Sequence, residues 1–245
     1  MTRRDVLGVE FDPVDLPGAV RTVVALAAAP GPHLVVTANV ELVMLARRSP
    51  ELQGVLRRAA LVVPDGVGVV WGSRQLGRGL PGRVPGIDLA DRLCAHAARL
   101  GWRIVLLGGI PGVAEAAAAR LRRVYPGVLI ALTLNGYFSP AEEPEVVRAI
   151  RDAAPTLLLA GLGSPRQERW LDRHLTALAV PVSMGIGGTL DVWAGRVSRA
   201  PRIIQTLGLE WCYRLIRQPG RLRRQVVIPQ FMAAVWWRRA GRRPP

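Results

Sequence analysis

The chain has 245 residues, of which half are hydrophobic, and a formal net charge of +15 at pH 7. This composition excludes a disordered chain and allows one large domain or two small ones with a sizeable core. The two cysteines, Cys94 and Cys212, lie far apart without a Cys-x-x-Cys motif, which argues against a disulfide framework and a thiolate zinc site. We therefore expect a cytoplasmic protein.

Neither end of the sequence shows an export or membrane-spanning pattern. Asp5, Glu10 and Asp12 interrupt the first residues before an apolar run reaches signal-peptide length. The longest strongly apolar segment near the end is the 12-residue run "VVIPQFMAAVWW", which contains a proline and a glutamine. Because a bilayer span needs roughly 20 apolar residues, we expect no crossing.

Six short apolar runs alternate with helical patterns. Continuous runs of Val, Leu and Ile are typical of parallel strands that are buried on both faces. Amphipathic segments lie between some of these runs, as at residues 87–101 and 112–127. The order predicts an α/β fold with a largely parallel sheet. The predicted strands lie within residues 33–39, 59–66, 103–109, 128–138, 156–163 and 180–188.

The ligand site of such a sheet lies beyond the carboxyl ends of the strands, where helix N-termini present free N–H groups to anions. Small and polar residues recur at these predicted ends, a pattern that suits a phosphate-bearing ligand. The segment "GGIPG" alone is equally well explained by a tight turn with close helix packing. The strand ends supply Thr37, Asn39, Asp65, Gly108, Gly109, Gly112 and the segments 135–138, 163–168 and 187–191.

Asp65 directly follows the apolar run "ALVV" and proline, and it precedes Gly66. A carboxylate held at the end of a buried strand suits catalysis. An ordinary N-cap of the next helix would have the same sequence pattern, so both readings stay open at this point.

The stretch "GLGSPRQERW" reads as the start of a helix, with Ser164 as N-cap, Pro165 at the first position and Glu168 complementing the helix dipole. A helix start does not require Arg166 or Gln167. An amide and a guanidinium at a strand edge could bind a base, sugar hydroxyls or phosphate.

Other catalytic signatures are missing. The three histidines fall in unrelated contexts and are expected to be structural. "GLGSP" is not a Gly-x-Ser-x-Gly motif, because Leu162 stands two residues before Ser164. No Asp-x-Asp pair occurs that would hold a metal ion on a nucleotide diphosphate.

The positive charge lies near the C-terminus. All 33 basic residues are arginine, which can reflect genomic base composition. From Arg196 onward there are 12 arginines and one acid, Glu210, so this segment carries +11 and residues 1–195 carry +4. In this segment arginines alternate with Ile, Leu, Trp and Tyr at helical spacing, which indicates a separate appendage.

Together these stretches resemble the WecG/TagA/CpsF glycosyltransferases, glycosyltransferase family 26. The matches run in order along nearly the whole chain. They include "TANVELV", "AALVVPDGVGVV", "GRVPGIDL", "NGYF", "GSPRQE", "GIGGTLDVWAGRVSRAPR" and "LEWCYRL". The resemblance implies a Rossmann-like catalytic core of the GT-E type over residues 1–195. It also implies a helical, Arg-rich appendage over residues 196–245.

The resemblance further implies an inverting, metal-independent transferase without a cofactor. Such an enzyme moves a hexose, N-acetylmannosamine or a relative such as glucose, from a UDP-sugar to a polyprenyl-diphosphate-linked saccharide. It works on the inner face of the cell membrane in the synthesis of teichoic acid, another cell-wall polymer or a surface polysaccharide. Inverting transfer needs one general base and stabilisation of the departing UDP.

Site residues follow from the same resemblance. Asp65 matches the family's proposed base, and the catalytic pocket would also hold Thr37, Asn39 and Arg83. The UDP-sugar would contact Gly108, Gly109, Tyr137, Gln167 and Asp191. The appendage would place Arg214, Arg221 and Arg224 over the diphosphate, a reasonable substitute for a metal ion.

The appendage is also implied to dock on an anionic membrane surface. Each remaining arginine would contribute about 1 kcal/mol, and Phe231, Trp236 and Trp237 suit the interface. Relatives form dimers or trimers in solution, so a homo-oligomer stays open. Ile87 and the lack of a histidine before Gly136 depart from the family pattern and leave the transferred hexose open.

Two other functions compete. An Arg-rich tail with tryptophans could track phosphates and stack on bases, but no recognised DNA or RNA module occurs, so we expect no nucleic-acid partner. A nicotinamide oxidoreductase would need Gly-x-Gly-x-x-Gly. The segment "GGIPGVAE" has the wrong spacing, and no acidic residue ends a following strand.

Overall fold

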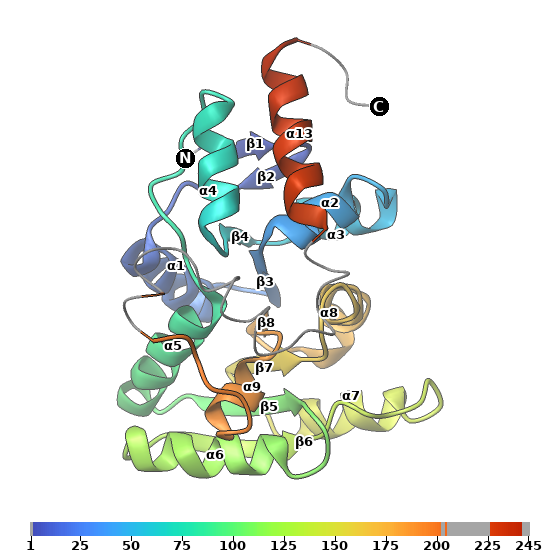
Figure 1. Ribbon diagram of the computed structural model, residues 1–245. Coiled ribbons are helices and arrows are strands. Elements are labelled where there is room, and N and C mark those ends of the chain that lie inside the picture. The colour runs from blue at the N-terminus through green and yellow to red at the C-terminus, as the bar shows by residue number, and fades with distance from the viewer. Residues whose placement is uncertain (1, 202–203, 205–225, 242–245) are drawn as a thin grey trace.

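A sheet of six parallel strands forms the centre of the computed structural model, which describes residues 2–201, 204 and 226–241 (Figure 1). The strand order is β4-β3-β8-β7-β5-β6, and every pairing is parallel. All six predicted strands are therefore confirmed. Their bounds are β3 His33–Ala38, β4 Leu61–Pro64, β5 Arg103–Gly108, β6 Leu129–Leu134, β7 Leu157–Gly161 and β8 Val182–Gly185.

Helices cover both faces of the sheet. Successive strand residues point to opposite faces, and both sets are apolar here, so each face packs against its own group of helices. On β3, Leu34 and Val36 belong to one apolar cluster and Val35 to the other. The first cluster includes side chains of α2 Val40–Ala46, α3 Pro50–Arg58, α4 Val67–Gln75, α7 Glu143–Asp152 and α8 Arg166–Leu178. The second includes side chains of α1 Leu16–Ala28, α5 Gly86–Leu100, α6 Val113–Val124 and α9 Thr189–Trp193.

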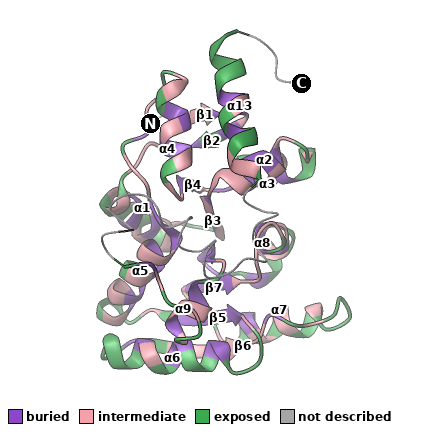
Figure 2. Cartoon of the chain, viewed as in Figure 1, coloured by how far each residue is buried: buried purple, intermediate pink, exposed green. Residues whose placement is uncertain are grey.

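The inner strands are buried on both faces as expected, but β6 is not. Most of its residues are half-buried, whereas the inner strands are largely buried (Figure 2). Leu129 is exposed. β6 lies at the edge of the sheet, and among the described strands only β5 pairs with it. Its apolar run therefore overstates its burial.

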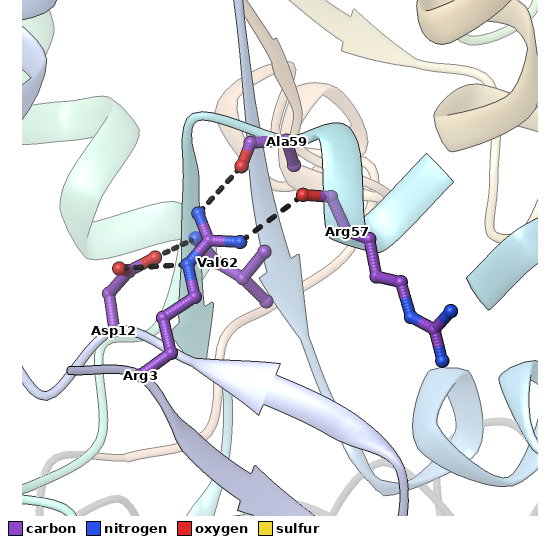
Figure 3. A network of polar contacts seen from close by, with 5 residues as sticks. All are labelled: Arg3, Asp12, Arg57, Ala59 and Val62. Atoms are coloured by element: carbon purple, nitrogen blue, oxygen red, sulfur yellow. Dashed lines mark hydrogen bonds and ion pairs between the residues drawn. The ribbon is translucent and has the colours of Figure 1, made fainter. Parts of the chain in front are cut away.

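A small antiparallel hairpin, β1 Arg4–Val6 and β2 Val9–Phe11, precedes the sheet and was not predicted. Asp12 joins it to β4, because Asp12 Oδ2 accepts a hydrogen bond from the Val62 N–H at 2.7 Å (Figure 3). Arg3 Nε donates to Asp12 Oδ1 at 3.1 Å, and another nitrogen of Arg3 donates to the Ala59 carbonyl at 2.6 Å. These contacts fix the hairpin beside β4.

Helix α13, Val227–Arg239, packs beside α2 and α4 (Figure 1). Phe231 is 1% exposed and belongs to the same apolar cluster as α2, so its predicted place at a membrane interface is wrong. A Cβ atom on Gly72 of α4 would lie 2.7 Å from the Phe231 ring, so this glycine allows the close approach of the two helices. This part of the predicted appendage thus packs against the sheet-bearing body. The boundary at residue 196 stays a prediction.

Within the described ranges, no helix is long and apolar enough to span a membrane.

Replacing Phe231 with Ala should lower the free energy of unfolding by about 3–5 kcal/mol, because it leaves a cavity between α4 and α13. Trp236→Ala on the same helix is the matched control. Its side chain is 63% exposed, and its removal should change stability by about 0.5 kcal/mol or less. Urea denaturation of both variants measures the difference. Equal, small losses would contradict the packing of α13.

Candidate active site

A cavity of about 380 Å³ opens beyond the carboxyl ends of β4, β3 and β8. The N-terminal ends of α4, α5 and α8 border it, together with the corner between β8 and α9. Six of the predicted site residues line it together. These are Thr37, Asn39, Asp65, Arg83, Gln167 and Asp191.

The register of two strands brings Asn39 and Asp65 together. Ala38 of β3 pairs with Pro64 of β4, and the Asp65 N–H donates to the Ala38 carbonyl at 2.9 Å. Asn39 and Asp65, which follow these paired residues, therefore lie on the same side of the cavity. Residues 26 positions apart in the chain become neighbours through parallel pairing alone.

Asp65 is not a helix cap. The N-cap of α4 is Gly66, whose φ of 106° turns the chain sharply after the strand. Asp65 therefore does not occupy the N-cap position, one of the two interpretations that the sequence allowed. Asp65 lines the cavity at the end of a buried strand, and its role as general base stays a prediction.

Asn39 and Thr37 have structural contacts as well as a place on the cavity wall. Asn39 is the N-cap of α2, and its Oδ1 accepts from the Leu42 N–H at 2.9 Å. Thr37 lies against the start of α5, because a Cβ atom on Gly86 would lie 2.8 Å from Thr37 Oγ1. This close approach brings the N-terminus of α5 to the cavity.

Helix α8 starts differently from the sequence expectation. The helix begins at Arg166 with Pro165 as its N-cap, and no side chain caps it, so the prediction of Ser164 as N-cap is wrong. Gly163 has a φ of 79° and turns its carbonyl toward the helix, where it accepts from the Gln167 N–H at 2.8 Å. A backbone carbonyl thus takes the bond that the serine was expected to take.

Gln167 and Glu168 are both buried at the cavity, with exposed fractions of 4% and 2%. Gln167 Oε1 accepts from the Gly187 N–H at 3.0 Å, and Gln167 Nε2 donates to Glu168 Oε1 at 2.8 Å. Burial raises the pKa of the Glu168 carboxyl, and the nearby charge of Glu41 acts in the same direction. Sequence analysis assigned Glu168 only to the helix dipole. The position of a glutamate in the first turn of a predicted helix does not show whether its side chain is buried.

An ion pair between distant segments forms part of the rim. Arg199 donates to the Asp88 carboxylate from two nitrogens, at 2.6 and 3.0 Å, and both residues are half-buried. Arg199 also lines the cavity. The sequence did not predict this pair, because 111 positions separate the two residues and no local pattern joins them.

Three predicted donor-binding residues lie elsewhere on the same edge and do not line this cavity. A Cβ atom on Gly108 would lie 2.5 Å from the Gly161 carbonyl, and one on Gly109 would lie 2.5 Å from Val113. These contacts support the close-packing reading of "GGIPG". Tyr137 is 71% exposed in the loop after β6. Their contact with a donor stays a prediction.

The appendage residues Arg214, Arg221 and Arg224 lie outside the described residues. In the part of the chain that the structure covers, no three His, Cys, Asp or Glu side chains form a group that could hold a metal ion.

The sequence of this chain is similar to a known protein family and to proteins of known name. Residues 4–245 match the model of the family described as "Glycosyl transferase WecG/TagA/CpsF family". A relative from Staphylococcus aureus strain MW2 is 35% identical over 230 residues, which cover 93% of this chain and 90% of the relative. A relative from Bacillus spizizenii is 35% identical over 201 residues, covering 82% and 77%. Both are named N-acetylglucosaminyldiphosphoundecaprenol N-acetyl-beta-D-mannosaminyltransferase.

Proposed function

The chain belongs to the WecG/TagA/CpsF family of glycosyltransferases, and from this premise we propose its reaction. It transfers N-acetylmannosamine, or a closely related hexose, from a UDP-sugar to a saccharide linked to polyprenyl diphosphate. The names of the relatives support this donor sugar and acceptor. The site observation that carries the proposal is Asp65, held at the cavity while Gly66 caps the helix.

In the proposed reaction the acceptor hydroxyl attacks the anomeric carbon on the face opposite UDP. The bond from the acceptor oxygen to the anomeric carbon forms as the bond from that carbon to the β-phosphate oxygen breaks. The electron pair of the broken bond leaves with UDP, and Asp65 takes the hydroxyl proton. One inversion at the anomeric carbon results, as a single displacement with one base requires.

Negative charge on the departing UDP needs stabilisation. Helices α4, α5 and α8 begin at the cavity, and the positive ends of their dipoles favour an anion there. Arg83 and Arg199 line the same cavity. We propose that these groups, completed by the appendage arginines, take the place of a metal ion.

Helix α13 supports the proposed membrane contact. Trp236, Trp237 and Met232 are exposed, and Arg238 and Arg239 follow in its last turn. Tryptophans beside arginines suit the boundary between lipid headgroups and acyl chains. We propose that this end of the chain docks on anionic lipid and brings the cavity to its lipid-linked acceptor.

The reaction can be tested with purified full-length protein in liposomes and EDTA. The substrates are a polyprenyl-diphosphate-N-acetylglucosamine analogue and a panel of UDP-sugars, with UDP release and product mass as readouts. We expect one hexose unit to be added despite EDTA, and the productive donor identifies the sugar. If the protein binds UDP but turns over none of the donors, the proposed identity of the acceptor is wrong. Absence of UDP binding would refute the proposed donor.

A further inference from the structure

Gln167 and Glu168 are adjacent in the chain, buried, and joined through their side chains at the cavity. Burying a carboxyl group beside an active cavity is costly unless the group is neutralised or satisfied. Among the described residues, no cation forms an ion pair with Glu168 to offset this cost, and the charge of Glu41 acts against a charged Glu168. The pair therefore calls for an explanation beyond the start of a helix.

The backbone of Gly187 fixes which way the Gln167 amide points. An N–H group can only donate, so the atom that faces Gly187 at 3.0 Å must be the amide oxygen of Gln167. The amide nitrogen then faces Glu168 Oε1 at 2.8 Å, and that oxygen must accept. The amide is thus held at both ends, and Nε2 carries a second N–H besides the one that it donates to Glu168.

Gly185 at the end of β8 makes room for this amide. A Cβ atom there would lie 2.7 Å from Gln167 Nε2 and 3.0 Å from its Cδ. The Gln167 side chain therefore crosses the strand end so closely that a side chain at position 185 would force the amide to shift. Alanine at this position would displace the amide from the Glu168 carboxyl.

The surroundings of Glu168 disfavour the charged form of its carboxyl group. Burial raises the pKa of Glu168, and the charge of Glu41 raises it further, against the lowering effect of the bond from Gln167. Glu168 Oε2 is buried and has no hydrogen-bond partner of good geometry in the described ranges, although the Ser164 side chain lies near.

We propose that Glu168 is a positioning residue for the sugar donor, whose carboxyl clamps the Gln167 amide between itself and Gly187 so that the amide can contact the UDP-sugar. Glu168 acts through Gln167 and does not touch the reacting atoms. The inference rests on the proposed use of this cavity for a UDP-sugar.

The test compares UDP affinity, measured by calorimetry, with the kinetic constants for the donor. Glu168→Leu removes the acceptor, and we expect at least a tenfold weaker Kd for UDP and a higher KM, with kcat at saturating donor changed much less. Glu168→Gln keeps a neutral acceptor of the same shape and should bind UDP within about threefold of the wild type. Gly185→Ala, which moves Gln167 but leaves Glu168 in place, should reproduce the loss caused by Leu.

Each outcome decides the matter. Wild-type affinity in Glu168→Leu, or an equal loss in Glu168→Gln, would overturn the positioning role while leaving the proposed function intact. If the wild-type protein itself does not bind UDP, the proposed function fails first. If Glu168→Leu does not fold, Glu168→Asp replaces it. The shorter side chain moves the carboxylate away from Gln167 by one methylene, and the same tenfold weaker Kd for UDP is expected.

Discussion

Asp65→Asn is expected to lower kcat by about 10²–10⁴-fold while the Kd for UDP stays within about threefold of the wild type. The amide has nearly the same shape as the carboxylate but cannot take the acceptor proton. Because Gly66 and not Asp65 caps α4, the substitution removes no helix cap and should leave the fold stable. Activity and binding should therefore separate cleanly.

The measurement pairs product formation, in liposomes with saturating donor, with UDP calorimetry on the same preparation. Asp172→Asn is the control. Asp172 lies on α8, does not line the cavity, and pairs with Arg58 at 2.7 Å on an exposed surface. The Asp172→Asn variant should retain full turnover. A rate for Asp65→Asn within tenfold of the wild type would assign the base to another residue.

The sheet could be predicted from sequence because each strand is a continuous apolar run that ends in glycine or a polar turn. Local composition suffices for such a strand, since burial on both faces leaves no alternation to decode. β6 shows the limit of this signal. Its run is as apolar as the others, yet its place at the edge of the sheet depends on strand order, which no local pattern specifies.

The hairpin at the N-terminus was missed for a related reason. Its strands have three residues each, too few for a period-two pattern, and Asp12 ties them to Val62, 50 positions away. Such a contact forms only after the sheet places both segments side by side.

At the site, the sequence pointed to the correct strand ends but not to the contacts between them. Thr37, Asn39 and Asp65 meet because parallel strands share a carboxyl edge, which topology predicts. The clamp on Gln167 depends instead on Gly187 and on the space left by Gly185, 18 to 20 positions further along the chain. Helix-start rules described the same stretch and assigned its carboxyl group to the dipole, because those rules contain no information on burial.

The appendage arginines carry the second large expected effect. Replacing Arg214, Arg221 and Arg224 together with Ala should lower kcat/KM at least about 100-fold, because hydrogen bonds to a charged group contribute about 1.5–3 kcal/mol each. The three positions lie outside the described residues, so the experiment tests their proposed role directly. It is sharper than deleting residues 196–245. Deletion would also remove Phe231 and Val235 and uncover the apolar surface of α2 and α4.

A matched control changes the same amount of charge elsewhere. Arg122, Arg123 and Arg148 are exposed on α6 and α7 and do not line the cavity, so their combined replacement with Ala should leave kcat/KM within about threefold. Both triple variants are assayed with EDTA in neutral detergent micelles, which removes any contribution from anionic lipid. A selective loss in the first variant then reports on the leaving diphosphate. Equal activity of the two variants would show that Arg83, Arg199 and the helix N-termini at the cavity neutralise the diphosphate without the appendage.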